Sequence, residues 1–179
     1  AYELVYNGTI NGTNYANVVV VSGTVNVAPK TLTKSDLVYT GQITKTYDGS
    51  DSAPTGLTVS VKSGSLVGTD TLTVTGTLKY NSANVNAANE ITFTPTAIIT
   101  GNYRLAATEV LTITGAKITA KDVKLTGGIN ATDRSYVKDN KTVDLTKGTL
   151  TFDGLVGSET LDVNIPATGT ISDAKVGAY

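Results

Sequence analysis

The segment KTYDGSDSA, residues 45–53, holds the side chains of this sequence that most resemble a chemical site. Asp48 and Asp51 are two nearby carboxylates, and hard cations such as Ca²⁺ bind several carboxylate and carbonyl oxygens. A calcium loop needs acidic residues at alternating positions and a late Glu, whereas this segment has two Asp and no Glu. Asp-Gly is also a strong turn pair, because Gly49 can adopt positive φ without strain. A turn is therefore the favoured interpretation, and we expect no bound metal.

Several absences from the composition limit the possible functions. The chain contains no His and no Cys, which removes the commonest general base, the commonest zinc ligand and any thiol nucleophile or disulfide. No pair of acidic residues stands out as a glycosidase dyad. We therefore expect a protein that is not an enzyme and uses no cofactor. The net charge of −1 disfavours nucleic acid and anionic membranes as partners, because both require basic patches.

Tyrosines supply a second kind of candidate. They recur at equivalent places in two halves of the chain, twice after Asn and twice in a Lys- and Asp-containing segment: Asn14-Tyr15, Asn102-Tyr103, Tyr47 and Tyr136. Exposed Tyr rings could stack on sugar rings. Alternatively, each ring packs in a β-sandwich while its hydroxyl bonds a backbone group, as in a tyrosine corner. Recurrence in both halves favours this structural role.

The elements that must position these residues are strands. Apolar and polar residues alternate with period two in stretches such as LTVSVKSGSL and EVLTITGAKIT, which is the pattern of a half-buried strand. Gly, Asn and Asp interrupt these stretches every few residues, as turns require. No long segment has the apolar spacing of a helix. The sequence predicts an all-β protein with short strands.

The chain also repeats itself. LVGTDTLTV at residues 66–74 matches LVGSETLDV at 155–163 with six of nine positions identical. The segment TNYANVVVVSGTVNVAPKTLTKSDL at 13–37 matches GNYRLAATEVLTITGAKITAKDV at 101–123, and other segments match in the same order. The two members of each matching pair are separated by about 88 residues, which indicates a tandem duplication.

The phase of the repeat suggests where domains begin and end. A joint near Pro29 is expected, because Pro cannot donate to a strand ladder. Residues 31–117 are then one complete domain, 1–30 the C-terminal part of a preceding repeat, and 118–179 the N-terminal part of a following one. An incomplete sandwich exposes strand edges, so we expect 118–179 to be completed by a segment equivalent to 1–30, from a longer chain or a neighbouring molecule.

These segments resemble the YDG/MBG-type repeats of large bacterial surface adhesins, such as filamentous-haemagglutinin-like proteins. The resemblance rests on KTYDGSDSA, LVGTDTLTVTGT, SANVNAANEITF and GNYRLAATEVLTITGAKIT, and it extends over essentially the whole chain in broken phase. The first copy departs from the pattern at Asn86, where the family has Gly. The second copy has RSYVKDNK in place of the signature, so it keeps Tyr136 but loses the Asp-Gly pair.

The resemblance implies tandem antiparallel β-sandwich repeats of immunoglobulin-like type; β-grasp-like modules are the alternative fold. It implies a non-catalytic stalk or extracellular fibre on the bacterial cell surface, which a Cys-free, Thr-rich composition also favours. The expected partners are neighbouring repeats of the same chain or further copies in a fibre. A carbohydrate- or host-protein-binding adhesin module is the alternative function. Isopeptide cross-links from Lys30 or Lys117 stay open.

Overall fold

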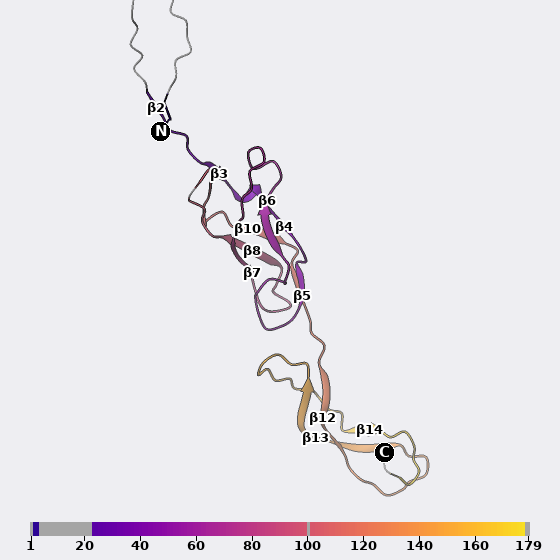
Figure 1. The fold of residues 1–179 in the computed structure, drawn as a ribbon. Coiled ribbons are helices and arrows are strands. Elements are labelled where there is room, and N and C mark those ends of the chain that lie inside the picture. The colour runs from indigo at the N-terminus through magenta and orange to yellow at the C-terminus, as the bar shows by residue number, and fades with distance from the viewer. Residues whose placement is uncertain (1, 4–22, 100, 178–179) are drawn as a thin grey trace, which may run out of the picture. The chain divides into compact units, whose positions relative to one another are not determined.

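The computed structural model describes residues 2–3, 23–99 and 101–177, and its regular secondary structure consists almost entirely of strands (Figure 1). Within these residues the exception is a single 3₁₀ turn, η1 (Lys34–Asp36). The all-β prediction is therefore confirmed. Asn14 and Tyr15 lie outside the described residues. No helix in the described part of the chain is long and apolar enough to cross a membrane.

Most strands have two to six residues, as the spacing of Gly, Asn and Asp predicts, whereas β12 has 8 and β13 has 12. In chain order they are β1 (Tyr2–Glu3), β2 (Thr24–Val25), β3 (Lys30–Leu32), β4 (Leu37–Thr40), β5 (Thr44–Thr46), β6 (Thr58–Val61), β7 (Gly76–Tyr80), β8 (Glu90–Pro95), β9 (Tyr103–Leu105), β10 (Leu111–Thr114), β11 (Lys117–Thr119), β12 (Lys124–Ala131), β13 (Thr142–Asp153) and β14 (Thr168–Thr170).

The chain divides into two compact units, and each unit is made of three separate segments of the sequence. Unit 1 contains residues 1–41, 56–78 and 92–113, and unit 2 contains 42–55, 79–91 and 114–179. Strands β7, β8 and β10 form a sheet in the order β10–β8–β7. The predicted domain boundaries at 30 and 117 describe repeats of sequence rather than these contact units, and they stay a prediction.

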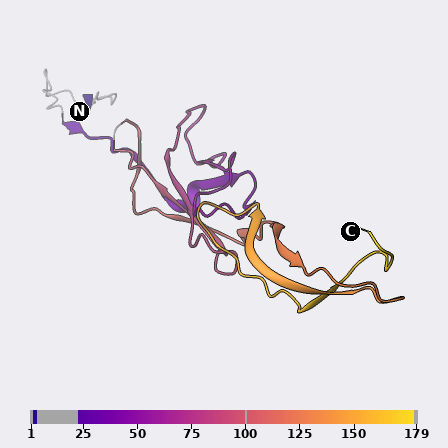
Figure 2. The ribbon, with the colours of Figure 1, turned by 90° about the horizontal axis from the view of Figure 1, so that it is seen from below.

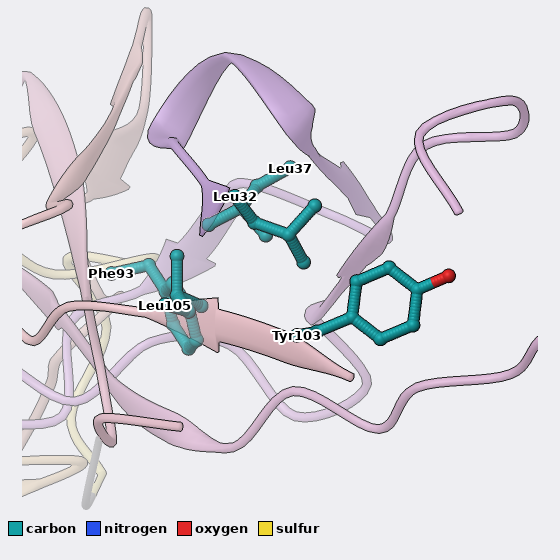
Figure 3. Packing of buried hydrophobic residues seen from close by; sticks show 5 residues of the cluster. All are labelled: Leu32, Leu37, Phe93, Tyr103 and Leu105. Carbon is teal, nitrogen blue, oxygen red and sulfur yellow. The ribbon is translucent and has the colours of Figure 1, made fainter. Parts of the chain in front are cut away.

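Unit 1 holds its core between short strand pairs. β4 pairs antiparallel with β6, and β3 pairs parallel with β9. Five side chains form the buried cluster shown in Figure 3: Leu32, Leu37, Phe93, Tyr103 and Leu105. Half-buried apolar side chains from the loop before β7, among them Leu66 and Leu72, pack against this cluster. The loop at 66–72 is therefore attached to the core by its own leucines.

Unit 2 combines a parallel pair with an antiparallel sheet. β5 pairs parallel with β11, while β13 lies between β12 and β14 and pairs antiparallel with both. Figure 2 shows β13 as a long curved strand, and its pairing with β12 has register shifts near Gly127. Among residues 120–177 only Val143 is buried, so this sheet has little covered apolar surface.

The expectation of antiparallel pairing therefore holds for part of the structure. Parallel pairing occurs where residues far apart in the sequence meet, at β3–β9 and β5–β11. Parallel neighbours need long connections, and more than 60 residues separate the members of each pair. The alternation of apolar residues predicts strands but carries no information on pairing direction.

Candidate functional site

The Tyr-Asp-Gly segment follows β5 directly and forms a turn in unit 2. The Tyr47 amide donates to the Thr119 carbonyl at 2.8 Å, which continues the β5–β11 pairing by one residue. Asp48 Oδ1 accepts the Ser50 amide at 2.9 Å, and Gly49 has a φ of +78°. An Asp side chain that bonds the backbone two residues on is an Asx turn. The sequence of this segment is thus that of a local turn, as its residue types predicted.

Lys45 stabilises this turn through two hydrogen bonds. Its ammonium donates to Asp48 Oδ1 at 2.7 Å and to the Ser50 carbonyl at 2.9 Å, and its side chain is only 11% exposed. The bond from Lys45, followed by that from the Ser50 amide, lowers the pKa of the Asp48 carboxyl. Asp51 instead pairs with Lys79 at 3.1 Å. Both carboxylates that suggested a calcium loop therefore have lysine partners.

Tyr80 anchors the strands beneath the turn. Its side chain is buried, and its hydroxyl lies 2.9 Å from the Ile43 carbonyl and 3.2 Å from the Lys117 carbonyl. The Lys45 ammonium lies 5.7 Å from the centre of the Tyr80 ring, a distance compatible with a cation–π interaction. Burial raises the pKa of Tyr80. This buried ring therefore links β5, β11 and the lysine of the turn.

Tyr47 reaches a second loop of the same unit. Its half-buried ring carries a hydroxyl that donates to the Glu159 carboxylate. This bond, with burial second, raises the pKa of Tyr47. Gly49 lies so close to Val156 that an added Cβ would sit 3.0 Å from a valine methyl. A cavity of about 470 Å³ opens between these groups; its other lining residues include Val85, Lys121, Gly154 and Leu161.

Tyr103 makes a comparable hydrogen bond to an acidic side chain in unit 1. Its ring is buried beside Leu32, and its hydroxyl points away from the cluster (Figure 3). That hydroxyl accepts the Val67 amide at 2.8 Å and donates to Asp70 Oδ2 at 2.7 Å. The Val67 amide lowers the pKa of Tyr103, but burial and the Asp70 bond together outweigh it, so the pKa is raised.

The two acidic partners occupy corresponding positions of the repeated sequence. Asp70 is the fifth residue of LVGTDTLTV and Glu159 is the fifth residue of LVGSETLDV. We call residues 66–72 the first acidic loop and residues 155–161 the second acidic loop. The repeat is evident in the sequence, but the role of these acids as tyrosine partners is seen only in the structure. The signal was present, since an acidic residue stands at the same position in both copies.

The remaining signature residues are placed differently. Tyr136, the counterpart of Tyr47, is 58% exposed, so the expected packed role is wrong for this tyrosine. Its segment has no short strand pair beneath it like β5–β11, and positive φ occurs at Asp139 instead of Gly. Asn102 is exposed and uses its backbone carbonyl to accept the Lys30 amide at 2.8 Å. Lys30 bonds the Ser65 carbonyl at 2.8 Å.

No group of three or more acidic side chains in the described residues is arranged to hold a metal ion. What the site offers is hydrogen bonding: two tyrosine hydroxyls donate to two carboxylates at the tips of related loops. Such bonds fix the position of a loop and carry no reaction by themselves. Each unit therefore contains one hydrogen bond from a tyrosine hydroxyl to the acidic side chain of its loop.

Comparison with known protein families matches residues 28–110 to the YDG domain. This range includes the Tyr47-Asp48-Gly49 turn, the first acidic loop and Tyr103. No curated protein and no solved structure matches the chain. Residues 28–110 of this chain therefore form a YDG-type domain.

Proposed function

We propose that this chain is a non-catalytic structural segment of a bacterial surface adhesin stalk or extracellular fibre. In this proposal, tandem modules of immunoglobulin-like type, each about 88 residues long, extend the protein and carry load. β-Grasp-like modules are the alternative arrangement. The match of residues 28–110 to the YDG domain supports the YDG part of the resemblance on which the proposal rests.

The observation that carries the proposal is the pairing of the strands near the two ends of the YDG domain. The early strand β3 pairs parallel with β9 in unit 1, and the late strand β11 pairs parallel with β5 in unit 2. Ladder hydrogen bonds lie across the strand direction. A force along β3 or β11 therefore loads all bonds of that ladder together. Shared loading is the arrangement that suits a stalk.

Single-molecule extension of the chain, held by handles at its two ends, tests this function. We expect a distinct unfolding event that releases about 30 nm of chain, the contour length of the 83 residues from 28 to 110 at full extension. Extension that proceeds without a force peak would contradict a load-bearing role. The same measurement on Leu105→Ala, which weakens the unit 1 core, should give a lower unfolding force.

A second candidate function has a specific observation in its favour. The cavity beside Tyr47 is lined by an aromatic ring, the Glu159 carboxylate and Lys121. Aromatic rings with nearby hydrogen-bonding groups suit saccharides. We therefore keep a carbohydrate- or host-protein-binding module as the alternative. A glycan array probed with the chain distinguishes the two, because saturable binding that Tyr47→Ala removes would favour the binding module.

A further inference from the structure

The two acidic loops differ in what covers them. In the second acidic loop, Val156 is half-buried where Gly49 approaches it, and Glu159 receives the Tyr47 hydroxyl. In the first acidic loop the corresponding Val67 is 61% exposed. Tyr103 bonds this loop from the core side and leaves the Val67 side chain uncovered. The first acidic loop therefore presents an exposed valine where the second has Val156 close to Gly49 of the Tyr-containing turn.

The segment that corresponds to the Tyr47 turn in the second repeat is also exposed. Tyr136 corresponds to Tyr47 in the repeat, and it is 58% exposed; its neighbour Val137 is 53% exposed. Tyr136 borders a cavity of about 430 Å³, where Val143, Ile171 and Val176 also lie. The chain thus holds one formed tyrosine-to-acidic-loop contact inside unit 2. It also presents an uncovered acidic loop in unit 1 and an uncovered tyrosine in unit 2.

We propose that the Tyr136 segment of one copy of this chain docks on the first acidic loop of a second copy, with Tyr136 at Asp70 and Val137 near Val67. The partner is a further copy of the same chain, and the hydrogen bond would correspond to the one that Tyr47 makes with Glu159. The inference rests on the proposed function, because in a longer array the same contact joins successive modules.

Asp70 can accept a second tyrosine. An ionised carboxylate has two oxygens with about four lone-pair directions, and Tyr103 occupies one of them through Oδ2. The surroundings of the acid also suit docking. A cavity of about 320 Å³ beside Asp70 is bordered by Val27, Pro29, Lys30 and Val67, and the Val27 side chain is 73% exposed. A tyrosine ring would cover these valines.

The contact joins unlike surfaces, so it does not close on itself. Each copy retains an uncovered tyrosine after its acidic loop is occupied, and heterologous contacts that fail to close produce open chains of copies. The interface is small, and small interfaces are weak. In an array of modules, a short linker holds neighbouring surfaces at an effective concentration on the order of 1 mM. Free copies should therefore associate in the same concentration range.

Sedimentation of the full chain at protein concentrations up to about 1 mM, the effective concentration of linked modules, tests the proposal. We expect the average mass to rise with concentration for the unmodified chain. Val67→Glu and Tyr136→Ser should each remain monomeric. Their equimolar mixture should associate and stop at the dimer, because one variant retains the tyrosine and the other retains the acidic loop. Ile129→Ser, at a side chain that is also exposed, is the matched control and should associate normally.

Tyr136→Phe provides a second variant that keeps the ring. Loss of one hydrogen bond should weaken association by about 2–10-fold. The proposal is overturned if the unmodified chain stays monomeric throughout the concentration range, if both single variants still self-associate, or if their mixture does not form a dimer. The extension experiment reads resistance within one chain, so loss of self-association with an intact force peak rejects this contact and leaves the proposed function standing.

Discussion

The first and second acidic loops have closely similar sequences but are fastened by different tyrosines. Tyr103 is buried, belongs to unit 1 and bonds both the Val67 amide and the Asp70 carboxylate. Tyr47 is half-buried, comes from a turn and bonds only the acid, Glu159. The first fastening is part of a core, whereas the second depends on a surface turn held by Lys45. The same loop motif is therefore held in two different ways in the two units.

The difference predicts that core damage affects the two loops unequally. Leu105 is 1% exposed and lies in the cluster on which Leu66 and Leu72 pack. Leu105→Ala should reduce the free energy of unfolding by about 2–5 kcal/mol, because the cavity adds to the lost burial. Chemical denaturation gives this value. Amide hydrogen exchange should accelerate in the first acidic loop and remain unchanged in the second, and equal acceleration in both would refute the distinction.

Tyr80 gives the complementary variant, in unit 2. Tyr80→Phe removes the hydroxyl that bonds the Ile43 and Lys117 carbonyls. Because the Ile43 carbonyl still accepts the Lys117 amide, we expect a loss of about 0.5–1.5 kcal/mol, the net contribution of one hydrogen bond. The variant should loosen β5 and β11 beneath the turn and, through it, the second acidic loop. Hydrogen exchange at the Tyr47 amide, which bonds the Thr119 carbonyl, is the appropriate measurement. Unchanged exchange there would show that the turn does not depend on Tyr80.

The two hydroxyls can be compared directly by removing each one. Tyr103→Phe should speed exchange of the Val67 amide, because that amide loses its acceptor. Tyr47→Phe is the matched variant: it should leave the Val67 amide unchanged and increase the motion of the second acidic loop. Nuclear magnetic resonance of both variants provides the comparison. A response of both loops to either variant would mean that the fastenings are not independent.

The pKa shifts predict opposite pH limits for the turn. The folded pKa of Tyr47 is raised, so its contribution to stability is present below the unfolded value of about 10 and is lost as pH rises above it. The folded pKa of Asp48 is lowered. Its contribution is present above about pH 4 and is lost as pH falls through the folded value. Thermal unfolding across the pH range should show both losses, and Asp48→Asn should reduce the acidic one without removing it, because the pKa values of Asp36 and Asp162 are also lowered.

The sequence predicts much of this structure but not the contacts that matter most. Alternation predicts strands, and the Asp48-Gly49 pair predicts the turn, because both depend on local geometry. The parallel pairing of β3 with β9 and the bond from Tyr47 to Glu159 join residues 73 and 112 positions apart. No local pattern encodes such distances. Tyr136 shows the limit clearly: its counterpart is half-buried, yet it is exposed because its surroundings differ.

The hydrogen bond from the Tyr47 hydroxyl to the Glu159 carboxylate holds the turn and the second acidic loop together. A double-mutant cycle with Tyr47→Phe and Glu159→Ala, followed by thermal unfolding, tests this coupling most directly, because coupled residues show non-additive effects. If they are coupled, the double variant should lower the midpoint by less than the sum of the two single decreases. Additive decreases would contradict the account, since they would mean that the hydroxyl and the carboxylate do not stabilise each other.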